Sequence, residues 1–374
     1  MTAVKIVVFG LSISSSWGNG HATLWRGLVA ALARRGHRVV FFERDVSYYA
    51  ENRDYTDLPG GELVFYTDWD AAAPTAREHL ADADAALVTS YCPDGQEACR
   101  LMLDAPVPVK AFYDLDTPVT LDALRAGKPV DYLPVNGLGD FDLVLSYTGG
   151  AALTALQRDL GARRVFPLYG SVDTEVHRPV LQLERFRADL SYLGTYAEDR
   201  QAALIQLFIE PAQQMPHQRF LLGGAMYPAD FPWTNNIFFV RHLPPYEHPA
   251  FYSSSRLTLN VTRRAMKEMG YCPSGRLFEA AACGCALLSD TWEGLEQFYT
   301  PGQEILIGES SPQAIAALEL SDAELTQIAR NARERTLAEH TADKRAEELV
   351  NALQNAYTGE ASLGQTVFAP AGAA

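Results

Sequence analysis

Basic residues are few for the length of this sequence. The 374 residues include 31 lysines and arginines against 46 aspartates and glutamates, which gives a formal net charge of −15 at pH 7. A protein of that charge repels the phosphates of nucleic acids and of anionic membranes. We therefore expect no nucleic acid among its partners.

Cysteine is also scarce. The five thiols are Cys92, Cys99, Cys272, Cys283 and Cys285. Their number is odd, and none forms a CxxC pair with the spacing of zinc ligands. This pattern predicts a reducing, cytoplasmic environment and no cysteine-bound metal.

Long apolar runs are absent as well. No stretch reaches the roughly 18 apolar residues that a membrane-spanning helix needs. The opening residues MTAVKIVVFG lead directly into a predicted strand, without the pattern of a cleavable signal. We expect no transmembrane segment and a cytoplasmic location.

Short apolar runs separated by helix-like stretches are abundant. The predicted strands are Val4–Gly10, Arg38–Glu43, Ala85–Tyr91, Val109–Asp114 and Asp142–Tyr147, then Asp189–Tyr196, Arg219–Gly224, Asn236–Leu243, Arg256–Thr262 and Cys285–Asp290. A typical helical stretch between them, His21–Gly36, ends in Arg, Arg and Gly as helix C-termini often do. Strands alternating with helices predict parallel α/β sheets, and 374 residues exceed one ordinary core. The sequence predicts two doubly wound, Rossmann-like lobes that face a cleft.

The domain boundaries follow from a change of composition. A polar, proline-containing stretch, Gly170–Arg185, is the expected hinge. We expect a first lobe over 1–170, a second over 171–340, a C-terminal helix over 341–358 that packs back on the first lobe, and a flexible tail over 359–374. In doubly wound sheets, ligands bind beyond the carboxyl ends of the strands.

The richest segment for chemistry is Asn260–Asp290. Residues 273–275 (Pro-Ser-Gly) form a helix start, and the helix continues to Gly284. The free amides of a helix start bind anions. Three basic residues, Arg263, Lys267 and Arg276, are close in sequence and are candidates to bind a diphosphate; alternatively they form a solvated charged patch.

Glu279 lies one turn into the same helix. Its carboxylate either complements the positive end of the helix dipole or accepts hydrogen bonds from the ribose hydroxyls of a nucleotide. The sequence leaves both interpretations open.

The loop after the first strand carries glycines before a predicted helix. Gly18 and Gly20 precede His21, and glycine lets backbone amides approach a ligand, so Gly20 is a candidate binding residue. His21 is either a helix-start residue without function or a group that contacts the donor phosphate or an acceptor hydroxyl. The loop departs from the dinucleotide fingerprint, since Thr23 takes the third glycine position. Glu43, at the end of the second strand, keeps a nicotinamide dehydrogenase as an alternative.

Two aspartates follow another predicted strand. Asp114 and Asp116 match a short DxD pattern by which some nucleotide-binding enzymes with a single nucleotide-binding lobe bind a metal, but this chain is predicted to have two lobes. We interpret Asp116 as an acceptor-binding or acid–base carboxylate, with loop capping as the alternative.

The string RLFEAAACGCALLSD, followed by TWEGLEQFYTPGQEIL, resembles the donor-site signature of family-four-like GT-B glycosyltransferases. The segment NVTRRAM…GYCPSGRLFEA resembles the CgeB-like, spore-maturation branch in particular. This resemblance implies a GT-B fold in which Glu279 binds the ribose. It further implies that Ser274, Gly275, Arg276, Arg263, Lys267 and Arg200 meet the diphosphate, with Gly194 and Thr195 in a facing glycine turn and His242 and Leu243 at the nucleobase.

One position departs from the family pattern. Many family-four enzymes carry a second glutamate eight positions before the ribose-binding one, where this chain has Tyr271. The donor-sugar contact is therefore expected to differ.

The resemblance implies transfer of a sugar from a nucleoside diphosphate sugar, with UDP favoured and with retention of configuration. We expect His21 and Asp116 as catalytic residues, no cofactor, no obligatory metal, and an acceptor that the sequence does not identify. A nucleotide-sugar epimerase of the same fold, the dehydrogenase and a catalytically silent scaffold remain alternatives, and the oligomeric state is open.

Overall fold

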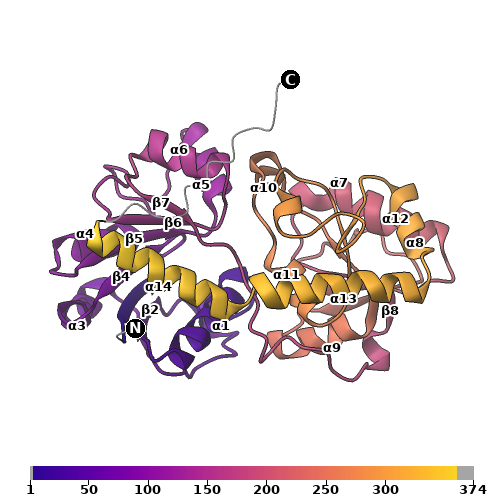
Figure 1. The fold of residues 1–374 in the computed structure, drawn as a ribbon, viewed down its shortest axis with the longest axis horizontal. Helices are drawn as coiled ribbons and strands as arrows, with labels where there is room; N and C mark the ends of the chain where they lie inside the picture. The colour runs from indigo at the N-terminus through magenta and orange to yellow at the C-terminus, as the bar shows by residue number, and fades with distance from the viewer. Residues whose placement is uncertain (1–2, 360–374) are drawn as a thin grey trace.

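The computed structural model describes residues 3–359, so the tail predicted over 359–374 lies outside the described residues except for Gly359. Figure 1 shows two α/β lobes side by side, with α14 running from the junction of the lobes across the first one. The predicted α/β architecture of two Rossmann-like lobes is confirmed.

The first lobe is built on a parallel sheet of seven strands within the described residues, in the order β3-β2-β1-β4-β5-β6-β7. Its strands are β1 (Lys5–Gly10), β2 (Arg38–Arg44), β3 (Glu62–Tyr66), β4 (Ala85–Thr89), β5 (Val109–Asp114), β6 (Leu143–Ser146) and β7 (Val165–Pro167). Its helices are α1 (Gly20–Arg34), α2 (Ser47–Ala50), α3 (Trp69–Ala81), α4 (Gly95–Asp104), α5 (Thr117–Arg125) and α6 (Ala151–Leu160).

The second lobe holds a parallel sheet of six strands in the described part of the chain, in the order β10-β9-β8-β11-β12-β13. Its strands are β8 (Ala188–Leu193), β9 (Phe220–Gly224), β10 (Ile237–Arg241), β11 (Ser255–Asn260), β12 (Ala286–Ser289) and β13 (Leu306–Ile307). Its helices are α7 (Gln201–Leu204), α8 (Glu210–Gln214), α9 (His248–Ser253), α10 (Arg264–Met269), α11 (Gly275–Ala282), α12 (Ser311–Leu318) and α13 (Asp322–Glu339).

Strand β1 shows why continuous apolar runs become central strands. Ile6 and Val8 lie in one buried cluster, whereas Val7 and Phe9 lie in another, on the opposite face of the sheet. Successive side chains of a strand point to opposite faces, so helices on both faces require every position to be apolar.

The chain crosses between the lobes twice, at neighbouring places. Val172 donates its N–H to the His340 carbonyl (3.0 Å), and Ala342 donates to the Val172 carbonyl (2.8 Å). The buried Arg345 donates from Nε to the carbonyls of Tyr169 and Gly170, both at 3.2 Å. One guanidinium therefore fastens the first crossing to the helix that follows the second.

Two helices follow one another at the end of the described chain. Ser321 and Glu324 form a reciprocal capping box at the start of α13, which ends at Glu339. Thr341 caps the next helix, α14 (Ala342–Thr358), whose buried face joins the core of the first lobe. The chain changes lobe at residues 340–341, between these two helices.

Among the described helices, none combines the length and the apolar character needed to cross a membrane.

Candidate active site

The two lobes enclose a cleft of about 580 Å³. Residues just beyond four central strands line it, namely Leu11 after β1, Leu115 after β5, Gly194 after β8 and Val261 after β11. Parallel strands bring their carboxyl ends to one edge, which is where doubly wound sheets bind ligands.

Nearly all of the residues selected from the sequence line this cleft. They are Gly20, His21 and Asp116 in the first lobe, and Gly194, Thr195, Arg200, His242, Leu243, Arg263, Ser274, Gly275, Arg276 and Glu279 in the second. Lys267 is the exception: its Nζ lies 3.1 Å from Glu309 and 3.7 Å from Asp290. The charge of Lys267 is thus balanced by two carboxylates away from the cleft lining.

Helix α11 starts at the cleft with its first turn unobstructed. The Ser274 side chain makes no capping bond to the helix. Arg276 is fixed in place because it donates from Nη1 to Asn260 Oδ1 (2.7 Å) and from Nε to the Leu193 carbonyl. Backbone amides and a fixed guanidinium at one helix start form an anion-binding site.

Arg200 and Arg276 both line the cleft, and neither forms an ion pair with a carboxylate of the described residues. Arg200 donates to the Thr195 carbonyl instead. Arg263 differs, since it is more exposed and lies 3.3 Å from Asp199. In a protein of charge −15, two arginines without acidic partners mark the position where an anion is bound most favourably.

Glu279 is buried against two histidines. Its Oε2 lies 3.3 Å from His248 Nδ1 and 3.9 Å from His177 Nε2. Burial acts to raise the pKa of Glu279, but the histidines and Arg276 outweigh it and lower that pKa to about 2. Glu279 is therefore a carboxylate that lines the cleft, and it is not a solvated helix-surface residue.

Sequence reasoning did not select either histidine. Nothing in the sequence connects His177, in the expected hinge, with Glu279 on α11. His248 could have been predicted as a site residue, because it begins α9 only a few residues after Leu243, a residue selected from the sequence.

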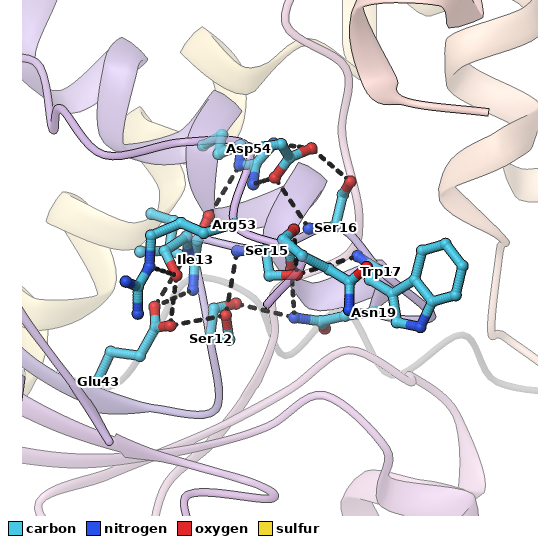
Figure 2. Close-up of polar contacts among 12 residues, drawn as sticks. Ser12, Ile13, Ser15, Ser16, Trp17, Asn19, Glu43, Arg53 and Asp54 are labelled. Atoms are coloured by element: carbon cyan, nitrogen blue, oxygen red, sulfur yellow. Dashed lines mark hydrogen bonds and ion pairs between the residues drawn. The ribbon is translucent and has the colours of Figure 1, made fainter. Parts of the chain in front are cut away.

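The glycine-containing loop of the first lobe is fixed from below by Glu43 (Figure 2). The Glu43 carboxylate accepts hydrogen bonds from the hydroxyls of Ser12 (2.9 Å) and Ser14 (2.6 Å), and from the amides of Ile13 (2.8 Å) and Ser14 (3.0 Å). Four donors occupy its two oxygens, and Glu43 is fully buried. Glu43 therefore supports the loop. The dehydrogenase alternative requires its carboxylate to bind a cofactor ribose, and the carboxylate is not available for that.

Asn19 completes the same loop and starts α1. Its side chain donates to the carbonyls of Ser12 (3.0 Å) and Ser15 (3.1 Å), while its Oδ1 accepts from the His21 amide (3.0 Å). The backbone of His21 is therefore positioned by a rigid loop, which suits a catalytic group.

His21 and Asp116 meet across the first lobe. His21 Nε2 lies 2.8 Å from Asp116 Oδ2, which also accepts from the Ser90 hydroxyl (3.2 Å). Burial acts to raise the pKa of Asp116, but His21, Ser90 and Arg263 hold it below its ordinary value. With a carboxylate fixing the proton on Nε2, Nδ1 is the basic nitrogen of the ring; it has no hydrogen-bond partner within residues 3–359.

Asp114, unlike Asp116, does not line the cleft. It is fully buried, and its Oδ1 accepts from the Asp116 amide (3.0 Å) and the Thr120 hydroxyl (3.1 Å). Burial, together with the nearby Asp116, raises the pKa of Asp114 to about 7. Of the two aspartates, only Asp116 lines the cleft, so the two carboxylates do not present a shared face to it.

Tyr271 lies between the lobes and outside the cleft lining. Gly149 of the first lobe donates to its carbonyl (3.0 Å), and its ring packs so closely that a Cβ on Gly150 or Gly294 would lie 2.3 or 2.4 Å from it. Its φ of 48° is unusual for a residue with a side chain. Tyr271 therefore forms an interlobe contact where the family pattern has a sugar-binding glutamate.

A second interlobe contact involves Trp17, whose ring centroid lies 4.5 Å from that of His242. His242 directly follows β10 with a φ of 51°. The rigid loop of the first lobe thus reaches the end of the second lobe's edge strand, where the resemblance implies the nucleobase.

Comparison with known proteins agrees with this arrangement. Residues 200–351 match the family model described as glycosyl transferase-like. Sucrose-phosphate synthase (tll1590) from Thermosynechococcus elongatus has a TM-score of 0.70 at 16% identity, over 96% of this chain and 100% of that chain. An alpha-glucosyltransferase in complex with UDP-glucose and DNA containing an abasic site has a TM-score of 0.71 at 12% identity, over 94% and 100%.

Anabaena Alr3699/HepE in complex with UDP-glucose is similar as well, with a TM-score of 0.64 at 13% identity over 94% of this chain and 100% of that chain. A search of curated proteins found no match. The fold is GT-B.

The comparisons thus show a glycosyl transferase-like domain over residues 200–351 within a GT-B fold. The matched residues contain α11 and most of the second lobe's part of the cleft. The finer assignment to the CgeB-like branch stays a prediction.

Proposed function

We propose that this GT-B enzyme transfers a sugar from a nucleoside diphosphate sugar, of the UDP type, to an acceptor held by the first lobe. One observation carries the proposal: the buried carboxylate of Glu279 and the fixed guanidinium of Arg276 lie one turn apart on α11 and line the same cleft. That pairing suits a ribose next to a diphosphate. Proteins of similar fold whose structures contain UDP-glucose support UDP as the nucleotide of the donor.

In the proposed reaction, the bond from the anomeric carbon to the β-phosphate oxygen breaks, and its electron pair leaves with the diphosphate. Arg276, Arg200 and the amides that start α11 stabilise the growing negative charge. The acceptor oxygen forms the new bond to the anomeric carbon and releases its proton. Because these cations belong to the protein, we propose that no metal is obligatory, so activity should survive a chelator.

His21 is the proposed recipient of that proton. Asp116 fixes the imidazole with Nε2 as donor, and the basic Nδ1 is buried without a partner among the described residues, so the proposal requires the His21 ring to turn toward the cleft when the acceptor binds. We keep retention of configuration, which the family resemblance implies, as part of the proposal. NMR of the product's anomeric centre tests it, and an inverted product would assign His21 and Asp116 to a direct displacement.

An epimerase of the same fold would form product without any acceptor, so omitting the acceptor separates the two activities. A cytoplasmic location is also proposed, and it is supported by five buried cysteines that are all free thiols.

The decisive experiment compares Glu279→Ala with Glu296→Ala, an exposed glutamate of the same lobe that serves as a matched control. Loss of charge-assisted hydrogen bonds worth about 1.5–3 kcal/mol should weaken UDP binding about 10- to 150-fold in Glu279→Ala only. Calorimetry with UDP and 2′-deoxy-UDP measures both affinities, and the folded Glu279→Ala protein should no longer distinguish the two. Unchanged affinity together with unchanged discrimination would refute the donor site.

A further inference from the structure

Three potential ligand atoms converge behind the cleft. His177 Nε2, His248 Nδ1 and Glu279 Oε2 all lie within 4.8 Å of one another. His248 and Glu279 line the cleft, whereas His177 lies beneath it and is 3% exposed. The three residues come from segments far apart in the sequence: the stretch after the first lobe crossing, the start of α9 and the middle of α11.

The hydrogen bonds of His248 show which of its nitrogens carries a proton. Its Nε2 lies 3.3 Å from the Leu243 carbonyl, and a carbonyl only accepts, so the proton is on Nε2. In the neutral ring, Nδ1 directs a lone pair at the Glu279 carboxylate, 3.3 Å away, and such a pair of acceptors is stable only with a second proton or a metal cation between them. Metal-binding histidines usually donate their other N–H to a carbonyl or carboxylate in this way.

His177 adds a second, independent observation. Both of its ring nitrogens are buried without a hydrogen-bond partner among the described residues, and Nε2 lies 3.9 Å from the same Glu279 oxygen. A buried polar group without a partner is costly, and here it faces two further acceptors. With the ring proton of His177 on Nδ1, its Nε2 is a third acceptor, and three converging acceptors are an arrangement that binds a cation.

We propose that His177, His248 and Glu279 form a binding site for a zinc-class divalent ion. Two imidazoles and one carboxylate are a donor set that tetrahedral zinc uses, with a fourth position left open. Ligand atoms about 2.0–2.1 Å from a tetrahedral ion are separated by about 3.3–3.5 Å, so the His248–Glu279 distance of 3.3 Å already fits. His177, at 3.9 Å, needs to approach by a few tenths of an ångström.

The ion would share its carboxylate with the donor ribose, a step that rests on the proposed function. An ion on Oε2 withdraws negative charge from Glu279 and weakens the hydrogen bonds it offers to ribose hydroxyls. The ion and the nucleotide should therefore lower each other's affinity, by the same factor in both directions. The ion is inhibitory and is not needed for transfer, so a chelator should relieve inhibition and leave activity intact.

The test uses the full-length protein, freed of metal, and titrates it with Co²⁺ and Zn²⁺. We expect one equivalent to bind, with the visible absorption of tetrahedral cobalt and without a thiolate charge-transfer band, since the proposed ligands contain no cysteine. Separate His177→Ala and His248→Gln variants should each lose about 10-fold or more in affinity. His217→Ala is the matched control, because His217 is exposed and far from this site in the sequence.

Thermal unfolding keeps the test decisive if one variant folds poorly. One equivalent of Zn²⁺ should raise the Tm of the wild type and of His217→Ala, and should not raise that of a folded His248→Gln protein. Absence of stoichiometric binding, or binding that survives both histidine substitutions, overturns the site. Metal binding without any effect on UDP affinity overturns only the shared-carboxylate step, which separates this failure from that of the donor site.

Discussion

Asp114 is a buried carboxyl of the first lobe whose ionisation affects the stability of the folded protein. Burial holds its pKa at about 7 in the folded protein, against an ordinary value of 3.8. Between these two values the folded chain keeps a proton that the unfolded chain releases, so the free energy of unfolding falls as pH rises through this range. Above about pH 7 both states are ionised, and the full cost of a buried charge next to Asp116 remains.

Replacement of Asp114 by Asn should remove this pH dependence. The amide oxygen keeps the hydrogen bonds from the Asp116 amide and Thr120, and no charge is left to bury. We expect the Tm of Asp114→Asn to equal that of the wild type near or below pH 3.8 and to exceed it by a margin that grows up to about pH 7 and then stays constant. Thermal unfolding across this range measures the effect, and Asp122→Asn on the exposed face of α5 is the control. A wild-type curve and a variant curve that stay parallel would contradict the buried-charge argument.

The His21–Asp116 pair makes a prediction about catalysis. In Asp116→Asn the side-chain amide can donate to Nε2 and so favours the tautomer with the proton on Nδ1, where it cannot accept another. Loss of a positioned base should lower kcat about 10²- to 10⁴-fold, and UDP affinity should stay the same.

Steady-state kinetics with a competent acceptor, alongside calorimetry with UDP, separates the two quantities. Asp122→Asn is again a suitable control on the same helix. An unchanged kcat in folded Asp116→Asn would remove the pair from the reaction.

At the scale of elements, the central strands were predictable, and of the four edge strands only β10 was predicted. Runs such as VKIVVFG became β1 because a strand covered on both faces must be apolar throughout. The sequence prediction omitted β3 (Glu62–Tyr66), β7 (Val165–Pro167) and β13 (Leu306–Ile307), all short strands with partly exposed residues. β7 and β13 are only three and two residues long, too short for a pattern to appear, whereas β3 contains an apolar run that the sequence prediction missed.

The site divides in the same way. Glu279, Arg276 and the start of α11 were predictable because one contiguous motif carries them. His177 and His248 were not, because a contact between a hinge residue and α11 depends on how the second lobe folds. The role of Tyr271 was equally hidden, since its partners Gly150 and Gly294 lie on different lobes.

We expect Tyr271 to stabilise the contact between the two lobes and to take no part in the reaction of the donor sugar. Tyr271→Ala removes a ring packed between two glycines and should lower the free energy of unfolding by about 3 kcal/mol. Tyr271→Phe keeps the ring and should be close to the wild type in stability and in kcat. Chemical denaturation and kinetics of the two variants check this. Loss of kcat in the stable Tyr271→Phe protein would show instead that the hydroxyl contacts the substrate.

At the scale of the whole molecule, three of the contacts between the lobes differ in kind. The paired crossings at Val172 and His340 are fastened by Arg345, Tyr271 packs against the Gly149–Gly150 turn, and Trp17 contacts His242. The crossings are continuous backbone, so their position changes little. The Tyr271 and Trp17 contacts are non-covalent contacts between surfaces of separate lobes, so a change in the angle between the lobes must alter them.

Trp17 should therefore report how the lobes close on the donor. His242 and Leu243 line the cleft, and the Trp17 ring lies on His242, so bound nucleotide should change the environment of this indole and its fluorescence. We expect the emission change to vanish in Trp17→Phe and to persist in Trp233→Phe, whose indole packs within the second lobe away from the cleft lining.

An aromatic contact of this kind contributes about 0.5–1.5 kcal/mol, so Trp17→Ala should raise the KM for the donor about 2- to 12-fold if the contact favours the closed form. The turnover number should change less, because Trp17 touches neither α11 nor the His21–Asp116 pair. An emission change that survives in Trp17→Phe would mean that another tryptophan responds to the nucleotide. It would contradict the expectation that lobe closure alters the contact between Trp17 and His242.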